Sequence, residues 1–264
     1  MRLSARRTFI GAAVLMAGIV GLNWTSTEAA DPVPESEMKT LFDQDVKNIN
    51  ALIDAGQKKS PGPLARGAPR GVKVNAMMIA YYANSRISGK NADADAKMAA
   101  LRDTALEVAA AAGKKNFVAA AKPAKLLDLK IAGKGEGKQM TVADMNKKVE
   151  MDIDDLMFQF KKAGIGGLDG EAEIKANCKT VKLKPNEISA LAARILVVAD
   201  YCDTITADLD PQKKTKKAWD GFNKDMRTAA MALQVAANGK NAKATQMAFD
   251  KVDRACTACH EVMK

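Results

Sequence analysis

The sequence has few aromatic side chains and little of the alternation between β-branched and polar residues that marks β-strands. Phe, Trp and Tyr together make up only 5% of its 264 residues. Ala, Lys, Met and Leu are abundant instead, and all four favour helices. The composition therefore argues against a protein built from sheets and predicts an all-α fold.

Histidine and cysteine are also scarce, and both are unevenly distributed. His260 is the only histidine, cysteine occurs four times, and residues 1–140 contain neither residue type. Two of the cysteines stand just before the histidine, in the sequence C-T-A-C-H over 256–260. Any site that needs a thiol or an imidazole must therefore use the second half of the chain.

The C-x-x-C-H sequence is the attachment signature of c-type haem, in which two thiols add across the haem vinyl groups and the imidazole binds the iron. A helix gives the spacing a physical basis, because positions i, i+3 and i+4 share one face and can reach one flat ligand. The sequence therefore predicts one covalent haem c. Cys256 and Cys259 would form the thioether bonds, and His260 would be the proximal iron ligand.

Other uses of the cysteines remain open. Zinc could be bound by Cys256 and Cys259 together with Cys178 and Cys202. A redox-active C-x-x-C pair is another use, but it gives no reason for the adjacent histidine. Cys178 and Cys202 could also form a disulfide in an oxidising compartment, if the segment from Cys178 to Pro185 ran back along the bundle almost fully extended.

The first 30 residues have the pattern of an export signal. Arginines precede an apolar run over 9–22, and a polar stretch then ends at Ala30. This run is short for a bilayer span, which favours a cleaved signal peptide over an uncleaved anchor. The Arg6-Arg7 pair also resembles a twin-arginine signal, but haem c is attached to unfolded thiols after export, so we expect the general secretory route. The mature protein is expected in the periplasm.

The formal net charge is +10 at pH 7, and the chain stays basic without residues 1–30. This charge would attract an acidic redox partner or an anionic membrane surface, although a solvated lysine-rich surface is the simpler explanation. We expect no nucleic-acid partner, because the chain is exported and has no basic stripe interleaved with aromatic residues.

The apolar spacing predicts eight helices in two groups of four, separated by Gly- and Pro-rich breaks. Spacings of three and four alternate in the second half, as antiparallel bundles require. We therefore expect two tandem antiparallel four-helix bundles, an independently folding haem-free bundle over 31–140 and a haem-binding bundle over 141–264. The expected helices span 35–56, 71–88, 92–112, 115–128, 141–163, 186–207, 211–237 and 241–263.

A single C-x-x-C-H near the C-terminus of a four-helix bundle resembles the cytochrome c′ family, the class II c-type cytochromes. The resemblance covers about 141–264 and includes Arg254 before the motif and Trp219 early in the third helix. Met263, where an aromatic residue is common in the family, and the extra N-terminal half depart from it. The resemblance implies electron transfer or binding of a small diatomic gas, NO or CO, without enzymatic turnover, and it is compatible with a homodimer.

The sixth iron ligand decides between these two functions. Four residues follow His260, so we expect the distal side of the haem to be covered from upstream. In an up-down-up-down bundle the end of the fourth helix lies beside the start of the first, which would place Met145, Val149 and Ile153 opposite His260. Met145 as sixth ligand would give a low-spin electron carrier, and Met157 is a further candidate. Val149 and Ile153 would instead leave an open apolar pocket, which is the arrangement favoured by the sequence.

Two functions of other classes compete with a cytochrome. An interaction or sensor protein would dock a partner on its haem-free half. A thiol oxidoreductase would need Cys256 and Cys259 as unmodified thiols in the mature protein.

Overall fold

The computed structural model describes five stretches of the chain: 35–58, 62–130, 135–204, 216–239 and 241–263. These stretches contain ten α-helices and two short 3-10 helices and no β-strand, so the all-α expectation is confirmed for them. The predicted signal peptide, residues 1–30, lies outside the described residues. No helix in the described stretches is long and apolar enough to cross a membrane.

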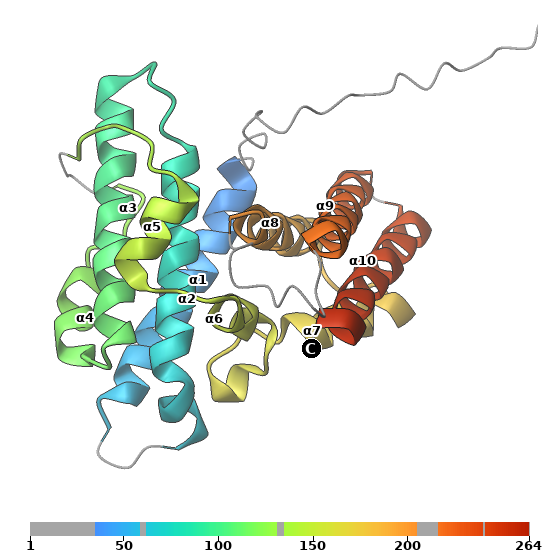
Figure 1. Cartoon of the computed structure of the whole chain (residues 1–264), viewed down its shortest axis with the longest axis horizontal. Helices are drawn as coiled ribbons and strands as arrows, with labels where there is room; N and C mark the ends of the chain where they lie inside the picture. The colour runs from blue at the N-terminus through green and yellow to red at the C-terminus, as the bar shows by residue number, and fades with distance from the viewer. Residues whose placement is uncertain (1–34, 59–61, 131–134, 205–215, 240, 264) are drawn as a thin grey trace, which may run out of the picture. The chain divides into compact units, whose positions relative to one another are not determined.

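Three of the four helices in the first half lie within a few residues of their predicted ranges, but the second begins at Pro63 and not at residue 71 as predicted. Each of the four packs on its neighbour in the sequence (Figure 1). Local signals explain where they begin. Pro63 stands in the first turn of the second helix, where its missing N–H costs no hydrogen bond. The side chains of Asn91 and Asn116 cap the third and fourth helices by accepting backbone N–H hydrogen bonds. The four helices are α1 (Glu35–Gly56), α2 (Pro63–Ser85), α3 (Ala92–Gly113) and α4 (Phe117–Ala124).

The second half differs from the prediction at its start, because no single helix covers 141–163. Glu150 adopts a left-handed conformation with φ of 51° and ends one short helix. The Asp152 side chain then caps the next helix by accepting a hydrogen bond from the Asp155 backbone N–H. The elements of this half are α5 (Val142–Val149), α6 (Ile153–Met157), η1 (Phe158–Phe160), η2 (Ala163–Ile165), α7 (Gly170–Lys179), α8 (Pro185–Cys202), α9 (Lys216–Asn238) and α10 (Ala242–Met263).

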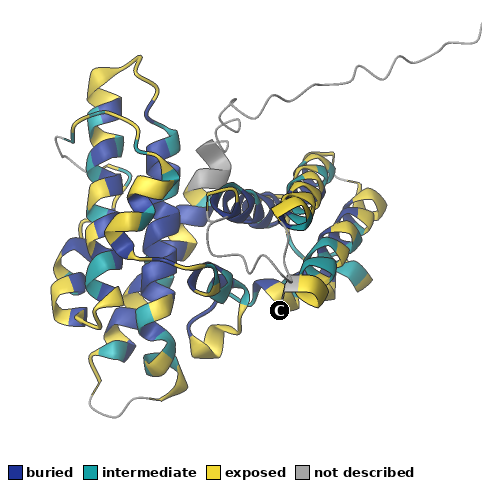
Figure 2. Cartoon of the chain, in the orientation of Figure 1, coloured by how far each residue is buried: buried dark blue, intermediate teal, exposed yellow. Residues whose placement is uncertain are grey.

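Buried apolar side chains form two cores that share α8. The first core is built by α1 to α6 with one side of α8 and the start of α9, and the second core by α7, α8, α9 and α10. Helix α8 is therefore buried along most of its length and lies between the two cores (Figures 1 and 2). The expected boundary at residue 140 falls inside the first core, because α5 packs on α3 and α6 packs on α2.

Helix α7 takes the place in the second core that was expected for 141–163. It packs against α10 and contributes Ile174, its one buried apolar side chain. Few features of the sequence indicate this helix, because its other residues are mostly polar or small.

The segment from α6 to η2 is fixed to α2 by charge and by close packing. Asp155 accepts hydrogen bonds from Arg70 Nε at 2.8 Å and from the buried Lys73 Nζ at 2.6 Å. Gly67 lets the η2 loop lie directly on α2, since a Cβ at this position would lie 1.7 Å from the carbonyl oxygen of Ile165. The first half thus sets the position of residues 153–165.

Candidate functional site

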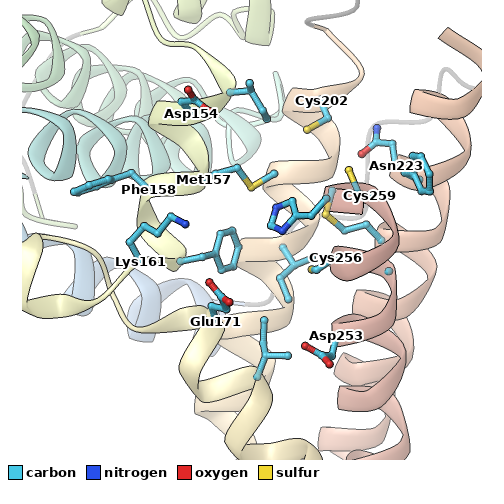
Figure 3. A pocket seen from close by; sticks show the side chains of 18 of the residues that line it. Asp154, Met157, Phe158, Lys161, Glu171, Cys202, Asn223, Asp253, Cys256 and Cys259 are labelled. Atoms are coloured by element: carbon cyan, nitrogen blue, oxygen red, sulfur yellow. The ribbon is translucent and has the colours of Figure 1, made fainter. Parts of the chain in front are cut away.

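The three residues of the C-x-x-C-H motif line one cavity, which we name the α10 cavity (Figure 3). Its volume is about 440 Å³, within the range of small-molecule and cofactor sites. Its walls come from α6, η1, α7, α8, α9 and α10, with Arg70 of α2 at one edge. Most of the lining is apolar and consists of Ile153, Met157, Phe158, Phe160, Ile174, Ile195, Trp219, Phe222, Met226 and Ala255.

The motif occupies the last turns of α10, with Cys256 and Cys259 partly buried and His260 exposed. Burial is the main cause that raises the pKa of the Cys256 thiol to about 11, and the neighbouring Cys259 and Asp253 add to this effect. Cys256 is therefore a protonated thiol at neutral pH in the chain without a ligand.

The opposite wall of the cavity is formed by α6. Met157 lies on this wall, across from the helix that carries Cys256 and Cys259 (Figure 3). Ile153 stands one turn earlier and also lines the cavity. The wall therefore offers one thioether sulfur and an aliphatic side chain to a ligand held by α10.

The structure brings together five of the predicted site residues, Ile153, Met157 and the three residues of the motif, and separates two others from them. Ile153 shares the cavity with the three residues of the motif, as expected. Met145 and Val149 do not line it, because both are buried in the first core on α5. The left-handed turn that ends α5 breaks the inward stripe that the sequence predicted from Met145 to Ile153.

Cys202 also lines the cavity, a position that only the zinc alternative had placed beside the motif. Its thiol is buried, which raises its pKa, and its carbonyl oxygen accepts a hydrogen bond from Trp219 Nε1 at 2.9 Å. Cys178 lies in α7, where Gln246 donates a hydrogen bond to its carbonyl oxygen. These two cysteines form no disulfide.

Among the residues that the structure describes, no cluster of side chains matches the zinc alternative. Within the described stretches, no group of three or more His, Cys, Asp and Glu side chains could hold a metal ion. A structural zinc site needs about four such ligands around one point.

Charged side chains stand at the edge of the cavity, and most of them were not foreseen. Arg70 lies over the Phe158 ring, 5.7 Å from its centroid, and Lys161 is a second cation in the lining. Glu171 also lines the cavity, and its hydrogen bond with Lys175 holds its pKa below the usual range. The Phe158-Gln159-Phe160 sequence was a local signal for this part of the lining, since it places two of the seven Phe residues two positions apart.

The residues of the α10 cavity are compatible with one haem c. Two thiols and an imidazole come from the end of one helix, which is the donor set that covalent attachment and axial ligation require. Apolar walls suit the porphyrin, and Arg70 and Lys161 can balance the charge of its propionates.

No protein-family model, curated protein or solved structure matches this chain. Its function is therefore inferred from its residues and their geometry.

Proposed function

We propose that this protein is an exported c-type cytochrome that holds one covalent haem c in the α10 cavity and transfers electrons. The observation that carries the proposal is that Cys256, Cys259 and His260 together border a mainly apolar cavity of about 440 Å³. The haem, when attached, supplies one-electron chemistry at its iron.

The side chains of the cavity have distinct tasks in this proposal. Cys256 and Cys259 attach the group to α10, and His260 donates one imidazole nitrogen to the iron. Apolar walls exclude water from the site. Because a site without water stabilises the more highly charged oxidised iron less well, the reduction potential is raised. Arg70 and Lys161 hold the propionates at the edge.

The finer architecture belongs to the same proposal. Helices α7, α8, α9 and α10 form the haem-binding bundle, and the haem-free half serves as the scaffold that holds α6 over the distal side. Residues 1–30 direct the chain to the periplasm, where an acidic redox partner meets its basic surface, and a homodimer is compatible with this function.

Binding of NO or CO is a second candidate function. It is favoured by Ile153 and the other aliphatic and aromatic side chains of the lining, which offer bound water few hydrogen-bond partners. Met157 decides between the two candidates, because a thioether bound to the iron would close the site to a gas.

Mass and spectra of the mature protein test the proposal. Produced in the periplasm of a host that matures haem c, it should have the mass of the cleaved chain plus one haem and the absorption bands of a c-type cytochrome. Cys256→Ala and Cys259→Ala should each leave a single thioether bond, and His260→Ala should keep the haem but change its axial ligation.

Cys178→Ala is the matched control, because Cys178 lies outside the lining of the α10 cavity. It should retain the wild-type mass increment and spectrum. A wild-type protein with the bare mass of its chain from the same host would reject the proposal.

A further inference from the structure

A cluster of polar side chains is buried behind the wall of the α10 cavity. Asp45 of α1 is fully buried and accepts a hydrogen bond from Arg194 of α8 at 2.8 Å. Arg194 is also buried and donates a second hydrogen bond to Gln159 of η1 at 3.1 Å. We name these residues, together with Tyr82 of α2, the Asp45 cluster.

The cluster is incompletely hydrogen-bonded. Asp45 Oδ2 and the Tyr82 hydroxyl are both buried, and neither has a hydrogen-bond partner in the structure. Tyr82 belongs to the cluster electrostatically, because the charge of Arg194 acts to lower the pKa of its hydroxyl and the charge of Asp45 acts to raise it. Buried polar atoms nearly always have hydrogen-bond partners. Asp45 Oδ2, which has none, is therefore an atom that can bind a proton or accept a hydrogen bond from a water molecule.

The cluster and the α10 cavity share a wall. Gln159 stands between Phe158 and Phe160, which both line the cavity. Arg194 directly precedes Ile195, another residue of the lining. The cluster and the cavity therefore draw on the same two elements, η1 and α8. A charge in the cluster acts on a charge in the cavity through protein, which is less polarisable than water.

A second cavity offers the cluster a route to solvent. It has a volume of about 340 Å³, and Arg194 and Gln159 are part of its lining. Gln44, Asn48 and Glu173 also line it. A cavity of this size with several polar partners admits water, which can carry protons.

We propose that Asp45 is a redox-linked proton site, so that this protein couples electron transfer to proton transfer. When the haem iron gains one electron from its donor protein, one proton moves from solvent to Asp45; when the electron leaves, the proton returns to solvent. The positive charge of the proton balances the added electron within one region of the molecule. The inference depends on the proposed function, since it requires the haem.

The charges around Asp45 support this role. Burial is the largest effect and raises the pKa of Asp45 to about 6, although the Arg194 guanidinium acts to lower it. Tyr82 of α2 faces the same pair, and Glu173 of α7 acts on Arg194. Asp45 can therefore change its protonation in the range where a periplasmic protein works.

The sign of the coupling follows from electrostatics. Oxidised iron carries one more positive charge than reduced iron, so oxidation lowers the pKa of Asp45 and reduction raises it. At a pH well above about 6, Asp45 stays negatively charged whether the iron is oxidised or reduced, and its charge stabilises the oxidised iron. The reduction potential should therefore fall as pH rises through about 6.

Potentiometry of the haem-loaded protein between about pH 4 and pH 8 tests the proposal. In the wild type the potential should fall in the middle of this range, with a slope of at most about 59 mV per pH unit, the value for one proton per electron. Asp45→Asn should abolish this slope. Asp43→Asn is the matched control, because Asp43 lies on the same helix but is exposed, and it should keep the wild-type slope.

Asp45→Asn leaves a buried guanidinium without its carboxylate, so its folding must be checked by circular dichroism. If Asp45→Asn unfolds, the proposal can be tested on the wild-type protein instead. The protein is produced with isotope-labelled aspartate, and its infrared spectra in the reduced and oxidised states are subtracted. A label-sensitive carboxylic-acid band should appear on reduction and persist in Asp154→Asn and Asp253→Asn, whose carboxylates line the α10 cavity.

Four results would overturn the inference while leaving the cytochrome intact. These are a potential independent of pH, a slope that folded Asp45→Asn keeps, a slope that Glu173→Gln loses while Asp45→Asn keeps it, and the absence of an aspartate band. A protein that binds no haem would overturn the proposed function together with this inference.

Discussion

Phe249 and Val252 of α10 are buried in the second core, and Cys256 packs against the same core one turn further along the helix. Spacings of three and four keep all three side chains on one face. The stripe that holds α10 in the bundle thus continues directly into the residues of the motif. Thioether attachment and packing are expected to stabilise the same helix.

Met157, rather than Met145, should be the sixth ligand, because Met157 lies in the α10 cavity opposite the motif. The ferrous wild-type protein should then be low-spin. Met157→Ala should make it high-spin and open it to carbon monoxide, as measured by absorption and resonance Raman spectroscopy.

Met145→Ala is the control for this substitution. Met145 is fully buried in the first core, so its truncation should lower the free energy of unfolding by about 2–5 kcal/mol without changing the spin state. If the ferrous wild type is already high-spin and binds carbon monoxide, Met157 is no ligand and gas binding becomes the better function.

Among the elements, the short segment from α6 to η2 links the two halves. It lies on α2 through Asp155 and the loop over Gly67, and it carries Met157 into the α10 cavity. Little of this placement could be predicted from the sequence. A left-handed residue such as Glu150 has no strong local signal. A long amphipathic helix such as α1 is instead indicated by its apolar period, and the start of α3 by the capping residue Asn91.

Gly67→Ala should disturb this segment, because the added Cβ would lie 1.7 Å from the carbonyl oxygen of Ile165. We expect a loss of about 1–3 kcal/mol in the free energy of unfolding and a changed haem spectrum, as the distal wall shifts. Thermal and denaturant unfolding measure the first effect, and absorption the second.

Gly221→Ala provides the matched comparison. Gly221 lies in α9, and a Cβ there would have no atom within 4 Å apart from its chain neighbours and the backbone of its own helix. This substitution should stabilise the protein by about 0.5–1 kcal/mol and leave the spectrum unchanged. Equal effects of the two substitutions would show that Gly67 is not needed for close packing.

At the scale of the whole molecule, the part of the cavity lining that could be predicted from the sequence is the part set by local spacing. Cys256, Cys259 and His260 follow from the motif and Ile153 from bundle geometry, and all four line the α10 cavity. Arg70 enters the cavity from a distant part of the chain, so no local pattern could have revealed it. The predicted division at residue 140 failed to capture the first core for the same reason: its members come from both halves.

This shared core changes the expectation for the isolated first half. Residues 31–140 lack Met145, Leu156 and the side of α8 that carries Val197 and Tyr201, all of them buried in the first core. The sequence predicted independent folding for this fragment, but these missing contacts should leave apolar surface exposed. We therefore expect weak helical circular dichroism and no cooperative melting from the fragment alone, whereas the mature chain melts cooperatively.

Addition of the complementary fragment makes this prediction specific. Mixed with a fragment that begins at residue 141, residues 31–140 should gain helix and a cooperative transition, because α5, α6 and α8 then complete the first core. Val197→Asp in the second fragment should prevent this gain, since it places a charge in the buried face of α8. If the first fragment instead melts cooperatively on its own at the temperature of the mature chain, the first half is an independent domain and its packing against α8 adds little to its stability.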